Sequence, residues 1–124
     1  AYCHCQSCRK WHTAPINAWA AWPSDAVTFS GDTITSDYNE RSERISCAKC
    51  GGCIANGKPK DGLMVVYPMT LAGSGLTFDP AFHIFYSERV MDVADELPKF
   101  VDAPKEFGFS GDLIDEPPTT GWRA

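Results

Sequence analysis

The chain contains the stretch Cys3-His4-Cys5-Gln6-Ser7-Cys8-Arg9-Lys10-Trp11, in which three cysteines are spaced Cys-x-Cys-x-x-Cys. Thiols this close in sequence are poorly placed for disulfides with one another. They suit a soft metal ion instead, because thiolates a few ångströms apart can converge on one tetrahedral centre. The spacing of Cys3, Cys5 and Cys8 therefore predicts a metal site, and zinc is the expected ion.

A second cluster, Cys47-Ala48-Lys49-Cys50-Gly51-Gly52-Cys53, has the Cys-x-x-Cys-Gly form of a zinc knuckle. Glycine suits the tight turn that the backbone makes under a metal. We expect a strand over 44–47 and another over 53–56, which together predict a zinc-ribbon-like hairpin with Cys47 and Cys50 as metal ligands. Cys53 either supplements this second site or is a buried free thiol.

Six cysteines in a short chain are also compatible with a secreted disulfide scaffold or with a redox-active pair. We expect no leader peptide, and a hydrophobic content of 44% indicates a chain that builds its own core. A thioredoxin-like pair at Cys47 and Cys50 requires a βαβ context, which the sequence does not suggest. Reduced cysteines at metal-ligand spacing favour a cytoplasmic protein.

Composition limits the other functions. A chain of 124 residues is expected to form one domain. Its net charge of −5 argues against a nucleic-acid-binding module, which normally presents a basic face. No run approaches the roughly 20 apolar residues that cross a bilayer, so we expect no membrane association.

The pattern along the chain predicts a mostly β fold. Runs rich in β-branched and aromatic residues, separated by glycine and proline turns, indicate short strands. The expected strands cover 13–23, a pair over 27–38 joined at Gly31-Asp32, a central strand over 63–69 and another over 81–87. Trp19 and Trp22 do not share a strand face. At least one of them therefore either packs in the core or lines a groove.

Several motifs in order resemble the glutathione-dependent formaldehyde-activating enzyme family. They are Cys-His-Cys-x-x-Cys-Arg-Lys, a Trp-Ala-Ala-Trp strand, Cys-x-x-Cys-Gly-Gly, His83-Ile84-Phe85-Tyr86 and Leu97-Pro98-Lys99-Phe100. The resemblance implies an Mss4-like fold of stacked antiparallel sheets over residues 1–109. Residues 110–124 are expected to form a polar, loosely ordered tail.

The resemblance also implies two zinc sites. Cys3, Cys5 and Cys8 match the ligands of the catalytic zinc, whereas Cys47 and Cys50 match two ligands of a structural zinc. The family completes the latter with an upstream Cys-x-Cys strand that is absent from this sequence. We therefore expect the second site to be metal-free or under-coordinated unless Cys53 or a neighbouring chain contributes. A missing strand would leave a sheet edge that favours a homodimer.

The activity implied by the family is the addition of formaldehyde to the glutathione thiol, formally carbon–sulfur lyase chemistry in reverse. Arg9 and Lys10 would bind the carboxylates of a glutathione-like substrate; alternatively they neutralise the thiolate cluster or face water. Trp11 shields the site or belongs to the core. The alternative function is a non-enzymatic zinc-binding module that contacts other proteins.

Three histidines complete the set of residues with chemical potential. In an extended segment His4 would point away from its cysteine neighbours, which predicts a surface residue. His12 could act as an acid or base or as a fourth ligand, although this is the less expected role. His83 lies in an aromatic strand and is expected to be a hydrogen-bonded core residue.

Overall fold

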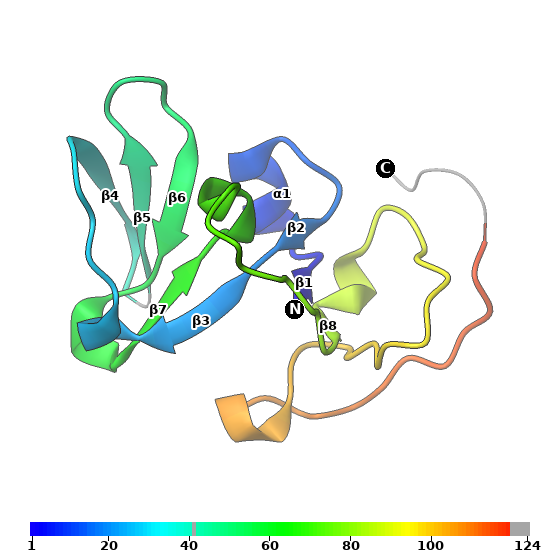
Figure 1. Cartoon of the computed structure of the whole chain (residues 1–124). Helices are drawn as coiled ribbons and strands as arrows, with labels where there is room; N and C mark the ends of the chain where they lie inside the picture. Colours follow the sequence, from blue (N-terminus) through cyan, green and yellow to red (C-terminus); the bar gives the residue numbers. More distant parts are fainter. Residues whose placement is uncertain (41, 120–124) are drawn as a thin grey trace. The chain divides into compact units, whose positions relative to one another are not determined.

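The computed structural model describes residues 1–40 and 42–119, and residue 41 and the last five residues of the predicted tail lie outside this description. The predicted mostly β fold is confirmed: two sheets contain eight strands, and one α-helix is present in the described chain. The chain divides into two compact units (Figure 1). Unit 1 comprises Ala1–Ala18 and the chain from Phe78 onward, and unit 2 comprises Trp19–Thr77.

The sheet of unit 1 has three short strands in the order β2-β1-β8. The central strand β1 (Tyr2–Cys3) pairs antiparallel with β2 (Asn17–Ala18) and parallel with β8 (His83–Ile84). Since Cys3 lies at the end of β1, the first cysteine cluster begins at the centre of this sheet.

Helix α1 (Gln6–His12) follows β1 directly and was not predicted. Cys5 is the N-cap residue, and its Sγ accepts a hydrogen bond from the N–H of Cys8 at 3.3 Å. The helix ends where Thr13 adopts the left-handed conformation, with φ of 51°. Cationic side chains in the last turn interact favourably with the helix dipole. The cysteine spacing is thus set by a cap and one helical turn.

The sheet of unit 2 is fully antiparallel, with the order β3-β7-β6-β5-β4. Its strands are β3 (Ala20–Pro23), β4 (Thr33–Asn39), β5 (Ser42–Cys47), β6 (Cys53–Asn56) and β7 (Leu63–Val66). The predicted hairpin around the second cysteine cluster is confirmed as β5 and β6. The predicted central strand over 63–69 is confirmed for its first four residues as β7, which lies between β3 and β6, whereas Pro68–Leu71 forms a 3₁₀ turn.

The predicted pair of strands over 27–38 is only half correct. Ser24–Ala26 forms a 3₁₀ turn, and the chain then runs without ladder pairing to β4. Val27 packs against the core of unit 2 instead of pairing in a sheet. A segment without strand pairing can also bury one side of the chain. Its apolar residues then alternate with polar ones, and the pattern resembles a strand in the sequence.

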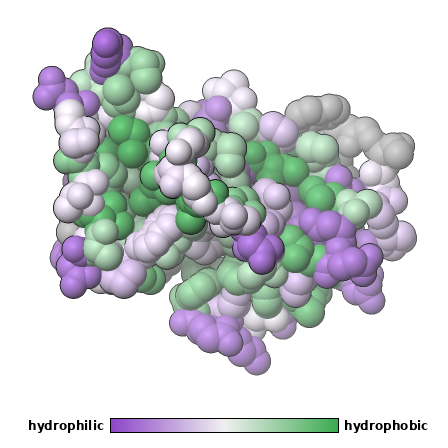
Figure 2. Space-filling model, in the orientation of Figure 1, coloured by the Kyte–Doolittle hydropathy of each residue, from purple (hydrophilic) through white to green (hydrophobic). Residues whose placement is uncertain are grey.

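The core of unit 2 contains Ile45, Ala55, Met64 and Val66. These residues come from three neighbouring strands and are at most 7% exposed. In Figure 2 hydrophobic side chains lie between hydrophilic ones over the region of this sheet. No helix of the described chain is both long enough and apolar enough to cross a membrane.

An ion-pair cluster binds the described end of the chain to the rest of unit 1. Arg89 is a buried residue, 8% exposed, and its guanidinium donates to Asp92 at 2.5 Å and to Glu116 at 2.7 Å. Asp92 also accepts hydrogen bonds from the backbone N–H and the hydroxyl of Thr119. We call Arg89, Asp92, Glu116 and Thr119 the Arg89 cluster.

Candidate metal centre

The predicted first cluster is assembled in the structure. The Sγ atoms of Cys3, Cys5 and Cys8 all lie within 4.8 Å of one another. Zinc–sulfur bonds of about 2.3 Å place tetrahedral sulfur ligands roughly 3.8 Å apart. The three thiols therefore fit zinc after a small contraction. The residues come from β1, from the N-cap and from the first turn of α1.

Hydrogen bonds within this group shift the pKa values of Cys5 and Cys3 in opposite directions. Cys5 receives hydrogen bonds from the thiols of Cys3 and Cys8 and from backbone N–H groups, which lower the pKa of Cys5 to about 2. The same thiol contacts, together with burial, raise the pKa of Cys3. Negative charge in the metal-free group thus collects on Cys5. Because a bound metal replaces the proton on the Cys3 thiol, metal binding is expected to release protons.

The predicted substrate-binding residues Arg9, Lys10 and Trp11 lie on α1, directly after Cys8. Arg9 donates from Nε to the carbonyl of His4 at 3.0 Å and from Nη2 to the carbonyl of Glu88 at 2.9 Å. Lys10 is exposed, and Trp11 is half-buried with its ring centroid 4.8 Å from that of His12. Arg9 therefore supports the loop before the helix, and binding of a substrate carboxylate by Arg9 and Lys10 stays a prediction.

His4 is a correction to the sequence analysis, because its side chain is fully buried and not at the surface. It does alternate with its cysteine neighbours, but the side to which it points is the interior of unit 1. The Nε2 atom of His4 lies 2.8 Å from Nδ1 of His83. His83 is confirmed as a buried histidine with hydrogen bonds, and its Nε2 lies 2.9 Å from Oδ2 of Asp95.

Both rings are held in the neutral form. Burial lowers the pKa of His4 to about 4, with further lowering from repulsion by the protonated form of His83 and by the positive charges of Arg89 and Arg9. Burial also lowers the pKa of His83, although its hydrogen bond to Asp95 opposes this shift. Near neutral pH the two histidines therefore act as hydrogen-bonding groups without net charge.

The second cluster lies in unit 2, in the turn between β5 and β6. The N–H of Cys47 donates to the carbonyl of Gly52 at 2.9 Å, and the N–H of Gly51 donates to the carbonyl of Cys47 at 2.8 Å. Backbone N–H groups of Cys50 and Lys49 lower the pKa of Cys47. This geometry is that of a knuckle, and a metal-binding role for Cys47 and Cys50 stays a prediction.

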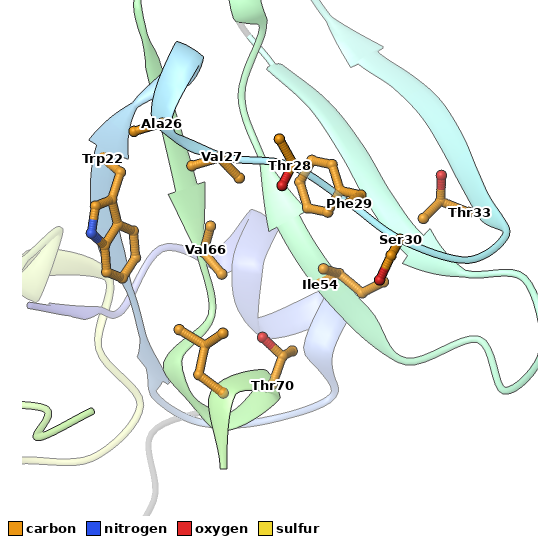
Figure 3. A pocket seen from close by; sticks show the side chains of 11 residues that line it. Trp22, Ala26, Val27, Thr28, Phe29, Ser30, Thr33, Ile54, Val66 and Thr70 are labelled. Atoms are coloured by element: carbon orange, nitrogen blue, oxygen red, sulfur yellow. The ribbon is translucent and has the colours of Figure 1, made fainter. Parts of the chain in front are cut away.

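Unit 2 also contains an open cavity of about 440 Å³ (Figure 3). Trp22 and Phe29 contribute aromatic walls, and Ile54, Val66 and Leu71 contribute aliphatic ones. The remaining lining includes four hydroxyl-bearing side chains and no charged ones. Trp22 thus combines the two alternatives considered for it, since it packs against the core and also lines a groove.

One of two comparisons with known proteins gives a match. A search of curated proteins finds no match. The sequence model of the glutathione-dependent formaldehyde-activating enzyme family matches residues 1–88. The matched region contains both cysteine clusters, α1 and the buried pair His4 and His83. The chain therefore belongs to the glutathione-dependent formaldehyde-activating enzyme family.

Proposed function

We propose that this protein is a zinc-dependent enzyme that joins a glutathione-like thiol to a small aldehyde such as formaldehyde, and catalyses the reverse carbon–sulfur cleavage. The convergence of Cys3, Cys5 and Cys8 carries this proposal. Three protein ligands are typical of a catalytic zinc site, whereas a structural site normally has four. Within the described chain this group contains no fourth side-chain ligand.

In this proposal the three cysteines are ligands and not nucleophiles. A zinc ion bound by them would lower the pKa of a substrate thiol in the fourth position, so that the thiolate forms near neutral pH. The substrate sulfur then forms a bond to the aldehyde carbon. The carbonyl oxygen gains the π electrons and takes up the proton that the thiol lost. With formaldehyde the product is the S-hydroxymethyl adduct of the thiol, and no oxidant or reductant is required.

The coordination shell provides the decisive test. We expect the reduced protein to bind one zinc per chain, and glutathione to add a sulfur to the three cysteine sulfurs. X-ray absorption at the zinc edge measures this change during a glutathione titration. S-methylglutathione is the control, because its thioether cannot become a thiolate. A shell that stays at three sulfurs would leave the non-enzymatic zinc-binding module as the better function.

Lys10 is the more accessible of the two cations that we propose for the substrate carboxylates. Lys10→Ala is expected to raise KM for glutathione about two- to fivefold with little change in kcat, because an exposed ion pair contributes up to about 1 kcal/mol. Lys60→Ala, at an exposed position in unit 2 outside the second cysteine cluster, is the control. A fall in kcat with KM unchanged would place Lys10 at the reacting atoms instead.

Arg9 and Trp11 belong to the same proposed substrate-binding set. Arg9 has guanidinium N–H groups beyond the two that bind backbone carbonyls, so one edge of the group can still meet a carboxylate.

All six cysteines are free thiols, which favours a reducing, cytoplasmic location. We propose no nucleic-acid partner, because the net charge is −5.

A further inference from the structure

Four side chains form a continuous chain of hydrogen bonds in unit 1. His4 contacts His83 at 2.8 Å, and His83 contacts Asp95 at 2.9 Å. The other oxygen of Asp95 accepts from Nζ of Lys99 at 2.7 Å. Both histidines are fully buried, whereas the side chain of Asp95 is 31% exposed. A chain of polar side chains therefore runs from His4, between Cys3 and Cys5, toward the surface of unit 1.

The chemistry of Asp95 fixes the direction of every hydrogen bond in this chain. Burial raises the pKa of Asp95, but hydrogen bonds from Lys99 and His83 outweigh it and lower the pKa overall. The carboxylate can only accept, so Nε2 of His83 carries a hydrogen and Nδ1 carries a lone pair. His4 must then donate from Nε2. Its own Nδ1 keeps a lone pair, in agreement with the lack of a hydrogen-bond partner for that atom among the described residues.

His4 is held in place by its backbone as well as by its ring, and this restrains the cysteines on either side of it. Its backbone N–H donates to the carbonyl of Ile84 at 3.1 Å, and its carbonyl accepts from Arg9. The ring packs edge-on against Tyr86 with centroids 4.8 Å apart. The ring, the N–H and the carbonyl are thus all engaged. This leaves the backbone between Cys3 and Cys5 little freedom to rotate.

We propose that His83 and Asp95 are positioning residues that hold His4, and through it keep the thiols of Cys3 and Cys5 at metal-binding separation. The proposal rests on the proposed function only in taking these thiols as a zinc site. Ordering ligands before the metal arrives reduces the entropy lost on binding. Outer residues that orient a metal site typically change its affinity 10- to 100-fold.

Two substitutions of His83 separate hydrogen bonding from packing. His83→Asn places an amide oxygen near the position of Nδ1 and can still accept from His4, whereas His83→Leu fills space without an acceptor. We expect the zinc dissociation constant, measured by chelator competition, to rise about tenfold in His83→Leu. The rise should stay below about threefold in His83→Asn. Equal affinities in the two variants would overturn the proposal.

Asp95→Asn tests the same chain without altering either ring. Lys99 and the N–H of Leu97 both donate to Oδ1, so an asparagine keeps its oxygen there and turns its NH₂ group toward His83. Both rings should then change tautomer, which ¹⁵N chemical shifts of the histidine rings report in the reduced, metal-free protein. The loss of charge-assisted hydrogen bonds should weaken zinc binding roughly threefold. Unchanged tautomers or an unchanged zinc affinity would contradict the proposal.

Asp102→Asn is the matched control in unit 1, because that carboxylate is bound by the N–H groups of Ala103 and Ser110. It should alter neither the histidine tautomers nor the zinc affinity. The outcomes also separate this inference from the proposed function. Zinc affinity that responds to His83, without a glutathione sulfur in the shell, overturns the proposed function alone. A glutathione sulfur with unresponsive affinity overturns the positioning role alone.

Discussion

Cys5→Ser is expected to remove stoichiometric zinc from the protein and to leave unit 1 folded. A four-ligand zinc site contributes roughly 10–16 kcal/mol, so one thiolate is worth about 3 kcal/mol, or about 100-fold in affinity. Cys5 is also the N-cap of α1, with its Sγ accepting from the N–H of Cys8. Serine is among the preferred N-cap residues, so the helix keeps its cap while the metal loses a ligand.

The measurement is zinc per chain after gel filtration of the reduced protein, with circular dichroism to confirm the fold. Cys53→Ser is the matched control, because Cys53 lies on β6 and is not part of the converging group. It should retain one zinc per chain. An unchanged zinc content in Cys5→Ser would remove the three-cysteine site and the function proposed from it.

Arg89→Ala is expected to lower the free energy of unfolding by about 3–5 kcal/mol, the usual effect of removing one partner from a buried ion pair. The side chains of Arg89 and Asp92 are 6% and 3% exposed, so the carboxylate would remain buried without its cation. Arg89 also donates to the carbonyl of Tyr86 at 3.0 Å. The loss therefore reaches β8 through the turn that follows it.

Urea unfolding near pH 7 measures this effect, and two variants calibrate it. Glu116→Gln should cost less than about 1 kcal/mol, because Glu116 is 63% exposed. Lys105→Ala, an exposed cation of unit 1, should be nearly neutral. Equal losses for Arg89→Ala and Glu116→Gln would show that burial of the Arg89 cluster does not determine its contribution.

The same cluster has a defined pH dependence. Hydrogen bonds from Thr119 and Arg89 lower the pKa of Asp92 below its ordinary value. A group with a lowered folded-state pKa stabilises the protein above the unfolded pKa of about 4, and this contribution is lost as the pH falls further. The difference in stability between wild type and Arg89→Ala should therefore be constant from neutral pH to about pH 5 and should shrink below about pH 4.

The sequence was informative where chemistry is local. The spacing of Cys3, Cys5 and Cys8 predicts their convergence because a cap and one helical turn join them. The hairpin of β5 and β6 was predictable because Cys-x-x-Cys-Gly specifies a turn. Helix α1 was missed because its cap is a thiol and its seven residues contain no apolar period.

The histidine chain was beyond sequence reasoning because its members are joined by tertiary pairing. His4 and His83 are separated by 79 positions and meet only because β1 and β8 are neighbours. No spacing rule connects them, and alternation along an extended segment does not say which side is the interior. His4 is fully buried because β8 lies beside β1, and the sequence around His4 does not reveal this pairing.

The parallel pairing of β1 with β8 has a consequence for the order of events in the cell. Tyr2 lies opposite His83, so the two strands cannot pair until more than 80 residues have left the ribosome. Asp95 and Lys99 follow later still. Contacts of such high sequence separation form slowly. We therefore expect the segment Cys3–Cys8 to leave the ribosome well before β8, and to take up zinc in its final geometry only once β8, Asp95 and Lys99 have followed.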